Sequence, residues 1–353
     1  MNLKNNLFNW YHIYKRDLPW RNTQNPYYIW ISEIILQQTR VNQGYDYFKR
    51  FIDRFPDIIT LANSEEQDVL IIWQGLGYYS RARNIHSAAK KIMKEFNGIF
   101  PNKYEDILNL KGIGEYSAGA IASLAFKKPY PAIDGNVQRV ISRLYEIDKP
   151  ISSANGKNEI KSIVLSIMDK NNPDIFNQSL IELGALICKP LNPDCEICPI
   201  NNHCFAFKNK TQQNFPVKIK TNKPRDRFFY YIVIKIKKAN QEYIYINKRL
   251  KNDIWKNLYD FPLIESNSQI PLNDNVFNDI SNLLMHKNFI ISKISSTVKH
   301  QLSHQTIYAT FIEIETEQEI IDKTTYNLIP IRLLKDYPLP KLIENYVEKI
   351  LLH

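Results

Sequence analysis

The sequence predicts a mainly α-helical N-terminal region followed by an α+β C-terminal domain. Apolar residues recur every three or four positions through about the first 207 residues, and short β-rich runs fill the last third of the chain. A basic segment lies between the two regions. A chain of 353 residues has room for roughly two or three domains.

The helical region is expected to span residues 1–207. Glycine and proline, which end helices or turn the chain, separate its periodic stretches. These stretches lie at 29–36, 69–73, 85–92, 118–125 and 160–167.

Residues 208–227 form the expected basic interdomain linker. They carry seven lysines and arginines but a single acid, Asp226, and two prolines. The remaining residues, 228–353, hold β-rich runs at 228–236, 243–247 and 305–314 around a helical stretch near 275–285. This order predicts a separate α+β domain.

The composition excludes disordered and collagen-like chains, because 44% of the residues are hydrophobic and 23% are charged. The net charge of +10 favours a nucleic-acid partner, although many proteins carry such a surplus without binding one. The longest apolar run, 228–236, is too short to span a membrane and contains Lys235. The N-terminus lacks the apolar core of a secretory signal, so we expect a cytoplasmic protein without membrane contact.

All four cysteines, Cys188, Cys195, Cys198 and Cys204, lie within 17 residues. Four thiolates this close in a reducing compartment can share one metal centre. Zinc and an iron–sulfur cluster both accept four sulfur ligands, so the ligand type leaves both open. Two disulfides or four unrelated thiols are the remaining alternatives.

Leu110-Lys111-Gly112-Ile113-Gly114 lies between two expected helices, at 102–110 and 117–125. Two glycines in a tight turn let the backbone approach a ligand, and the N–H groups of the following helix can bind a phosphate. The segment could therefore hold a DNA backbone, or it could be an ordinary turn.

Two carboxylates are candidates for catalysis. Glu33 lies in a helix that is apolar nearly all round, where desolvation would raise its pKa toward that of a general acid. A solvated or paired position on the polar edge of the helix is the alternative. Asp134 directly precedes a helix, where an aspartate is also a common cap.

These features, taken in order along the chain, resemble the helix-hairpin-helix DNA glycosylases that carry an iron–sulfur cluster. Within that superfamily they resemble the adenine DNA glycosylases of MutY type. The resemblance implies two helical lobes, an iron–sulfur loop at 188–204 with a [4Fe–4S] cluster rather than zinc, and a Nudix-like C-terminal domain. It rests on Leu-Pro-Trp-Arg at 18–21, the segments 32–41, 73–81, 110–118 and 134–140, the four cysteines, and Leu-Ser-His at 302–304.

The resemblance implies a base-excision repair enzyme that hydrolyses the N-glycosidic bond of adenine mispaired with 8-oxoguanine or guanine. Adenine leaves poorly as an anion, so Glu33 would protonate its N7. Asp134 would stabilise or trap the oxocarbenium-like sugar, as a second carboxylate does in retaining glycosidases. Asn136 would help to place Asp134, and Tyr116 would line the same pocket.

The partner implied is double-stranded DNA, bound by a monomer in the bacterial cytosol or nucleoid. The target base must be flipped out of the stack into a pocket. The resemblance assigns the pocket walls to Trp20, Arg21 and Leu36, the stack-filling role to Gln38 and Tyr78, the backbone contact to Gly112 and Gly114, and recognition of 8-oxoguanine to Ser303 and His304.

Tyr116 separates this reading from an endonuclease III-like glycosylase and lyase for oxidised pyrimidines, in which a lysine at this position forms a Schiff base. A non-catalytic DNA-binding iron–sulfur protein is the third alternative, and the retained pair of Glu33 and Asp134 argues against it. The sequence departs from the family at Leu302, where an aromatic residue is common, and at 258–262, where Leu-Tyr-Asp-Phe-Pro replaces Leu-Trp-Glu-Phe-Pro. No catalytic run of arginine and glutamate occurs in 263–287.

Overall fold

The computed structural model describes residues 3–219, 224–238, 241–271, 274–284, 288–318 and 324–351. Residues 220–223 of the expected linker and Met285 of the expected helix lie outside these ranges. The chain divides into two compact units. Unit 1 comprises Met1–Ser64 and Asn84–Lys220, and unit 2 comprises Glu65–Arg83 and Thr221–His353.

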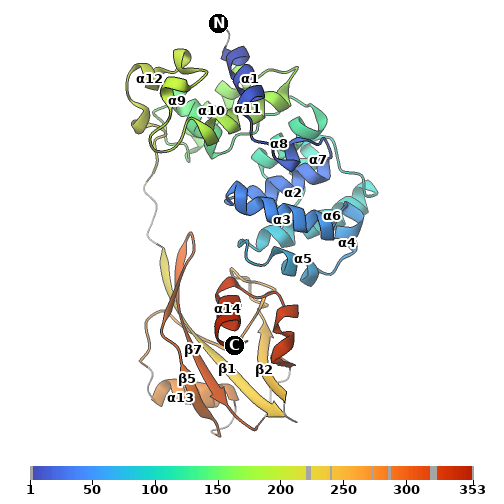
Figure 1. Ribbon diagram of the computed structural model, residues 1–353, viewed down its shortest axis with the longest axis vertical. Coiled ribbons are helices and arrows are strands. Elements are labelled where there is room, and N and C mark those ends of the chain that lie inside the picture. The colour runs from blue at the N-terminus through green and yellow to red at the C-terminus, as the bar shows by residue number, and fades with distance from the viewer. Residues whose placement is uncertain are drawn as a thin grey trace. The chain divides into compact units, whose positions relative to one another are not determined.

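Unit 1 is helical, as the periodicity predicts (Figure 1). Helix α6 begins in the part of the chain assigned to unit 2 and continues into unit 1. Helix α6 spans Ser80–Phe96. The other α-helices of unit 1 are α1 (Leu3–Tyr14), α2 (Pro26–Leu36), α3 (Val41–Arg54), α4 (Ile58–Asn63), α7 (Tyr104–Leu108), α8 (Glu115–Phe126), α9 (Gly135–Tyr145), α10 (Ala154–Ile167), α11 (Pro173–Leu186) and α12 (Phe205–Lys208).

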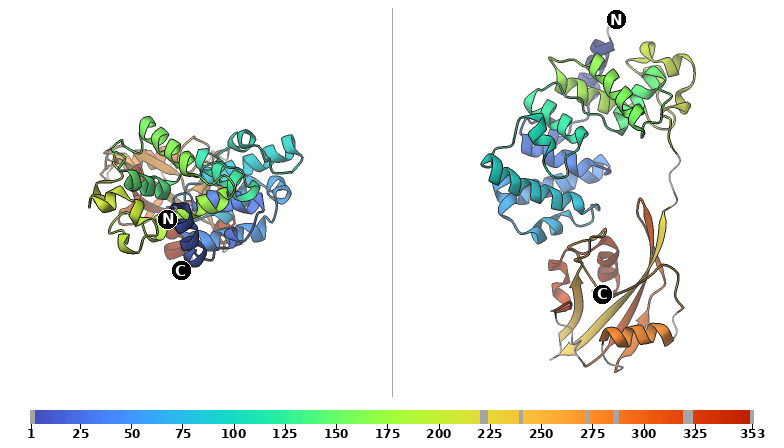
Figure 2. Two further views of the ribbon diagram at one scale, coloured as in Figure 1. Left: turned by 90° about the horizontal axis from the view of Figure 1, so that it is seen from above. Right: turned by 180° about the vertical axis from the view of Figure 1, so that it is seen from behind.

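The first helix completes a core built mostly by residues far along the chain. Leu7 and Trp10 of α1 are buried against Val140 of α9, Ile160 of α10 and Phe176 of α11. In both ribbon views α1 lies beside the green helices α9–α11 (Figures 1 and 2). The two ends of unit 1 are thereby held together by apolar burial.

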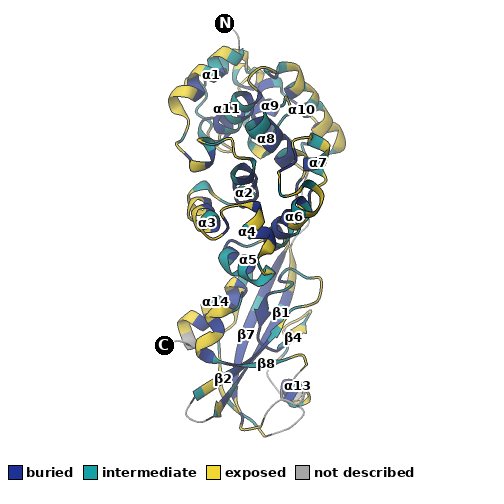
Figure 3. Ribbon diagram, turned by 90° about the vertical axis from the view of Figure 1, so that its right-hand side faces the viewer, coloured by how far each residue is buried: buried dark blue, intermediate teal, exposed yellow. Residues whose placement is uncertain are grey.

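Helix α2 is the central helix of unit 1, and its sequence explains why. Asn25 caps it by accepting a hydrogen bond from the Tyr27 backbone N–H at 2.9 Å, and Pro26 occupies its first position. From Ile29 to Ile35 every residue is buried, Glu33 included, and the ribbon is dark blue there (Figure 3). Helix α2 contacts both α3 and α8, as a helix apolar nearly all round should.

Small residues let the backbone of α8 approach the segment that follows it. A Cβ on Gly119 would lie 2.1 Å from the carbonyl oxygen of Pro131. That segment leads to Asp134, whose carboxylate caps α9 by accepting from the Val137 backbone N–H at 2.8 Å. The close approach of α8 therefore helps to fix where α9 begins.

Unit 2 is built on a mixed sheet with the strand order β3-β2-β1-β7-β5. Strands β1 and β7 pair in parallel, and the other pairings along this path are antiparallel. Strand β1 begins at Arg225, inside the expected linker, because Arg225 already pairs with Gln305 of β7. The strands are β1 (Arg225–Lys238), β2 (Gln241–Lys248), β3 (Tyr259–Asp260), β4 (Leu263–Ser266), β5 (Ile290–Ile294), β6 (Val298–Gln301), β7 (Gln305–Glu315) and β8 (Asn327–Pro330).

Alternation along β1 produces two apolar faces, as expected for a strand covered on both sides. Ile232 and Ile234 pack in one cluster with Val276 and Ile280 of helix α13 (Asp274–Leu284). On the other face, Tyr231 stacks on Phe311 of β7, which stacks in turn on Tyr346 of helix α14 (Lys341–Tyr346) with ring centroids 3.9 Å apart.

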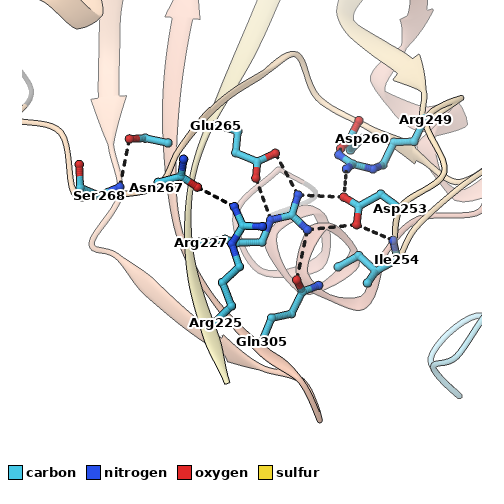
Figure 4. A network of polar contacts seen from close by, with 11 residues as sticks. Arg225, Arg227, Arg249, Asp253, Ile254, Asp260, Glu265, Asn267, Ser268 and Gln305 are labelled. Carbon is cyan, nitrogen blue, oxygen red and sulfur yellow. Dashed lines mark hydrogen bonds and ion pairs between the residues drawn. The ribbon is translucent and has the colours of Figure 1, made fainter. Parts of the chain in front are cut away.

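A network of ion pairs holds the β1–β4 edge of the sheet (Figure 4). Arg227 of β1 donates to both carboxylate oxygens of Glu265 at 2.7 and 2.9 Å and to those of Asp253 at 3.1 and 2.8 Å. Arg249 extends the network from Asp253 to the buried Asp260. Paired and hydrogen-bonded charges of this kind can be buried at acceptable cost.

The segment Glu65–Arg83, with helix α5 (Glu66–Trp73), belongs to unit 2 although the sequence places it among the helices of the first region. Asn257 donates to Glu66 at 2.5 Å, and the Leu339 backbone N–H donates to Gln74 at 3.1 Å. Tyr79 also donates to the Leu339 carbonyl at 3.2 Å. Polar groups separated by more than 170 residues in the chain thus hold this segment on the C-terminal sheet unit.

Among the described residues, we find no helix with the length and apolar character needed to cross a membrane.

We predict that Gly119→Ala lowers the stability of unit 1. The new methyl group would collide with a backbone carbonyl, which cannot move without shifting the start of α9. Overpacking of this kind costs about 1–3 kcal/mol, which thermal unfolding would detect. Gly135→Ala is the control, since its Cβ would meet nothing within 4 Å. Equal unfolding temperatures for the two variants would contradict the prediction.

Candidate active site and cysteine site

A cavity of about 810 Å³ in unit 1 collects most of the predicted site residues. Its lining comes from α2, from the N-terminus of α8, from the start of α9, from α11 and from the short helix η1 (Pro19–Arg21). The predicted residues that line it are Trp20, Arg21, Glu33, Leu36, Gln38, Gly114, Tyr116, Asp134 and Asn136.

Glu33 is buried in this cavity, which rules out the solvated alternative. The pKa of Glu33 is raised to about 7, chiefly by burial and in smaller part by the nearby Asp134 carboxylate. A hydrogen bond from Tyr116 and the positive charge of Arg21 act in the opposite direction. A carboxyl group with a pKa near neutrality can hold a proton at neutral pH and give it up during a reaction.

Asp134 is both a helix cap and a member of the site. Its Oδ1 accepts from the Val137 N–H, and its Oδ2 accepts from Asn136 Nδ2 at 2.7 Å. Burial raises the pKa of Asp134, while these hydrogen bonds and the charge of Arg139 lower it. The donors stabilise the ionised form of a carboxylate that is mostly withdrawn from water.

Tyr116 interacts electrostatically with both carboxylates, Glu33 and Asp134. Burial raises its pKa well above the ordinary value, and the negative charges of Glu33 and Asp134 raise it further. The phenol therefore stays protonated and donates to Glu33.

Arg139, which the sequence reasoning missed, fixes the orientation of Asn136. Its Nη2 donates to Asn136 Oδ1 at 2.8 Å, which turns the amide nitrogen of Asn136 toward Asp134. Arg139 also donates to the carbonyl oxygens of Gly184 at 2.8 Å and of Cys188 at 2.7 Å. Its position one helical turn after Asn136 was the available sequence signal.

Two further residues of α11 belong to this site and were missed. Gln178 lines the cavity, and Tyr11 donates a hydrogen bond to its side-chain oxygen. Glu182 is completely buried and binds Arg16 and Arg21, two arginines of the cavity wall. Like Glu33, Glu182 is an acid among apolar neighbours, a pattern that could have identified it.

The glycine hairpin has a structural reason for its first glycine. Gly112 has φ +83°, and a Cβ there would lie 2.7 Å from Asn84 Cβ. Gly114 precedes α8 and lines the cavity, whereas Gly112 is absent from its lining.

Tyr78, Ser303 and His304 lie in unit 2 and do not line this cavity. Tyr78 has φ +49° and is 42% exposed, and its hydroxyl donates to Ser303 Oγ at 3.0 Å. Ser303 and His304 form the turn between β6 and β7, which closes with a hydrogen bond from the Leu302 N–H to the Gln305 carbonyl at 2.9 Å.

The four cysteines are free thiols that line one small cavity. Arg143 of α9 donates to Cys188 Sγ at 3.4 Å and to the Lys189 carbonyl at 2.6 Å. Burial raises the pKa of Cys198 to about 12, and the other three thiols contribute to this shift. The walls between them are apolar and include Val140, Leu144, Leu183, Ile200 and Phe207.

This donor set fits an iron–sulfur cluster. The four cysteines line a shared apolar space, which suits a cluster that takes one thiolate at each of four irons.

Family models match three stretches of the chain. Residues 31–164 match the HhH-GPD superfamily base excision DNA repair protein. Residues 188–204 match the iron-sulfur binding domain of endonuclease III, and residues 232–349 match the NUDIX domain.

Relatives with similar sequences cover most of the chain. The adenine DNA glycosylase of Buchnera aphidicola subsp. Baizongia pistaciae is 40% identical over 86% of this chain and 83% of its own length. That of Buchnera aphidicola subsp. Acyrthosiphon pisum is 35% identical over 98% of this chain and 97% of its own length.

Solved structures support the helical fold of the first region. A thermostable thymine-DNA glycosylase matches with a TM-score of 0.54 and 24% identity over 58% of this chain and 94% of its own. An endonuclease III in a non-covalent DNA complex matches with a TM-score of 0.51 and 22% identity over 60% of this chain and 97% of its own.

These findings confirm the predicted fold class and the choice of a [4Fe–4S] cluster over zinc. They also confirm the adenine-specific reading over the two alternatives. The chain belongs to the adenine DNA glycosylases: it is a base-excision repair enzyme that removes adenine from DNA and carries a [4Fe–4S] cluster.

Proposed function

We propose that the substrate is adenine paired with 8-oxoguanine or guanine in double-stranded DNA, and that the enzyme acts as a monomer in the cytoplasm. The buried pair of Glu33 and Asp134, in a cavity of about 810 Å³, is the observation that supports the proposed chemistry. One carboxyl group is held near neutrality and the other is surrounded by hydrogen-bond donors, as an acid and a charge-stabilising group require.

Glu33 acts first, as the general acid. It transfers its proton to N7 of the flipped adenine while the bond between C1′ and N9 breaks, and the bonding electron pair leaves with the base. The base departs neutral, which removes the obstacle of an adenine anion. Positioned proton transfer of this kind contributes about 10²–10⁴-fold to the rate.

Asp134 compensates the positive charge that develops on the sugar. It can do so as an ion or by transient bonding to C1′, as the second carboxylate does in retaining glycosidases. Water then adds at C1′ and gives its proton to the Glu33 carboxylate, which restores the acid. Asn136, held by Arg139, keeps the Asp134 carboxylate in position.

Tyr116 determines that the reaction stops at base removal. A Schiff base with the opened sugar requires an amine, and a phenol offers none. Tyr116 instead donates to Glu33 and contributes to the pocket. The enzyme is therefore monofunctional in this proposal.

The pocket for the flipped base uses Trp20, Arg21 and Leu36 as walls. Trp20 is buried and packs edge-on against Phe48, with ring centroids 5.3 Å apart, so its indole has a fixed orientation. Gln38 and Tyr78, both with positive φ, would fill the stack that the base leaves. Gly114 and the N-terminus of α8 would contact a phosphate.

Recognition of 8-oxoguanine is assigned to Ser303 and His304. This lesion differs from guanine by an oxygen at C8 and an N–H at N7, which a hydroxyl and an imidazole can read by hydrogen bonds. The hydrogen bond from Tyr78 to Ser303 supports this assignment, because it brings the residue proposed to fill the stack beside the residue proposed to recognise the lesion, within unit 2.

The iron–sulfur cluster has a structural role in this proposal, which is to shape the 188–204 loop for DNA binding.

The first prediction concerns the acid. Glu33→Gln keeps the shape of the side chain but has no proton to transfer, so single-turnover adenine release should fall by at least about 10²–10⁴-fold while duplex binding persists. The matched control is Glu95→Gln, which removes an exposed carboxylate paired with Lys91. A Glu33→Gln enzyme with a tenth of the wild-type rate would remove Glu33 from this role.

The second prediction concerns the cluster. Protein purified without oxygen should contain about four irons per chain, one for each thiolate. Cys198→Ser should lower the iron content and the unfolding temperature together, since Cys198 lines the buried centre of the site. Metal analysis that finds one zinc per chain and no iron would contradict both parts.

The third prediction tests lesion reading. The double variant Ser303→Ala/His304→Ala should lose one or two hydrogen bonds, worth about 1–3 kcal/mol. Its affinity advantage for 8-oxoguanine over guanine should shrink roughly ten-fold or more, measured by duplex binding with each mispair. Ser268→Ala, in an exposed turn of unit 2, is the control. Equal losses on both mispairs would indicate that the turn is only structural.

A further inference from the structure

Glu182 is a buried acid that binds two arginines of the active-site cavity wall and has no assigned role in the chemistry. It lies on α11 with none of its side chain exposed. Arg16 donates to it from the backbone N–H at 2.9 Å, from Nε at 2.9 Å and from Nη2 at 2.6 Å. Arg21 donates from Nη1 at 2.9 Å and from Nη2 at 2.6 Å. Five hydrogen bonds therefore reach one carboxylate, four of them from two guanidinium groups and one from a backbone N–H.

The Glu182 carboxylate and the guanidinium groups of Arg16 and Arg21 are all charged. Burial alone would raise the pKa of Glu182, but the hydrogen bonds and charges of Arg21 and Arg16 outweigh it and lower the pKa to about 2. Two guanidiniums and one carboxylate leave one net positive charge at the cavity wall. Breaking such a buried pair from one side leaves an uncompensated charge that seeks another partner.

The proposed catalytic acid, Glu33, is a second carboxylate that acts on Arg21. Arg21 and Glu33 line the same cavity and interact electrostatically. A guanidinium fork binds a carboxylate at two points, and Glu182 already occupies both terminal nitrogens of Arg21. An Arg21 that turned to Glu33 would hold Glu33 as an anion with no proton to donate.

We propose that Glu182 is a positioning residue that holds Arg21 on the wall of the base pocket and keeps the Arg21 guanidinium from pairing with Glu33. The inference rests on the proposed role of Glu33 as general acid. Glu182 acts through Arg21 and does not touch the reacting atoms. Arg16 strengthens the arrangement, because it binds the same carboxylate and lines the same cavity.

The pH dependence of adenine release reports this arrangement. Glu33 must be protonated to act, so the wild-type rate should fall as the pH rises through about 7. The charged and titratable groups that face Glu33 are Tyr116 on α8, Asp134 before α9 and Arg21 on η1. Tyr11 on α1, with Arg16 and Glu182, faces Arg21, and Arg139 faces Asp134.

The test is single-turnover adenine release from pH 5 to 9 with the intact holoenzyme. In the wild type, the alkaline limb of the pH profile is the fall in rate above about pH 7. In Glu182→Gln, Arg21 loses its carboxylate partner, so this limb should move to lower pH by about one unit. The rate on the alkaline side should then be roughly ten-fold lower than that of the wild type. Glu182→Asp keeps the charge and should keep the wild-type limb. Glu95→Gln should also keep it.

The double variant Arg21→Met/Glu182→Gln tests whether Arg21 causes the shift of the alkaline limb. Without the guanidinium, Glu33 loses a group that lowers its pKa, so the limb should return to the wild-type position or move above it. This variant also returns the cluster to the net charge of +1 that it has in the wild type, because Arg16 alone remains charged, whereas Glu182→Gln leaves two positive charges. A double variant with the same downward shift as Glu182→Gln would overturn the proposal.

Two other outcomes would also overturn it. A Glu182→Gln enzyme that is slower at every pH, with an unmoved limb, would give Glu182 a structural role only, while Glu33 would remain the acid. A wild-type enzyme with no alkaline limb near pH 7 would refute the role of Glu33 itself, and with it the inference. Circular dichroism and iron content confirm that each variant is folded.

Discussion

The site depends on how firmly helix α9 is fixed at its N-terminus. Asp134 caps the helix, Gly184 of α11 admits the backbone of Asn136 where any side chain would collide, and Arg139 donates to Asn136, Gly184 and Cys188 together. These contacts leave Asp134 one orientation, with its oxygens occupied by donors. Arg143, further along the same helix, donates to Cys188 Sγ at 3.4 Å. One helix therefore contacts the cysteine site and also begins at Asp134.

Glu33 and Glu182 show how partners decide the state of a buried acid. Both lie on largely apolar helices and both are withdrawn from water. Glu33 faces a phenol and a second carboxylate, and its pKa rises to about 7. Glu182 faces two guanidiniums, and its pKa falls to about 2. Desolvation is common to the two, so the specific neighbours separate an acid that can give up a proton from a permanent anion.

Local sequence patterns predicted what local forces decide. The apolar periodicity of 29–36 identified α2, β-rich runs identified β1 and β7, and cysteine spacing identified the metal site. The motif match placed Glu33, Tyr116 and Asp134 in what proved to be one cavity. Gln178 and Glu182 were missed because their partners are distant in the chain: Gln178 meets Tyr11 across 167 positions and Glu182 meets Arg16 across 166. The membership of α5 in unit 2 was missed for the same reason, because the sequence around α5 does not indicate its contacts with Asn257 and Leu339.

That membership means that the two compact units are interleaved along the polypeptide rather than placed one after the other. A cut in the basic segment near residue 220 would not separate them, because 65–83 would stay with the first piece. Glu66, Gln74 and Tyr79 would then lose the hydrogen bonds that Asn257 and Leu339 supply and would present those groups to water. A chain that lost the C-terminal sheet would therefore need different residues on this face of its helices, although Glu66, Gln74 and Tyr79 precede the first strand by 146 to 159 positions.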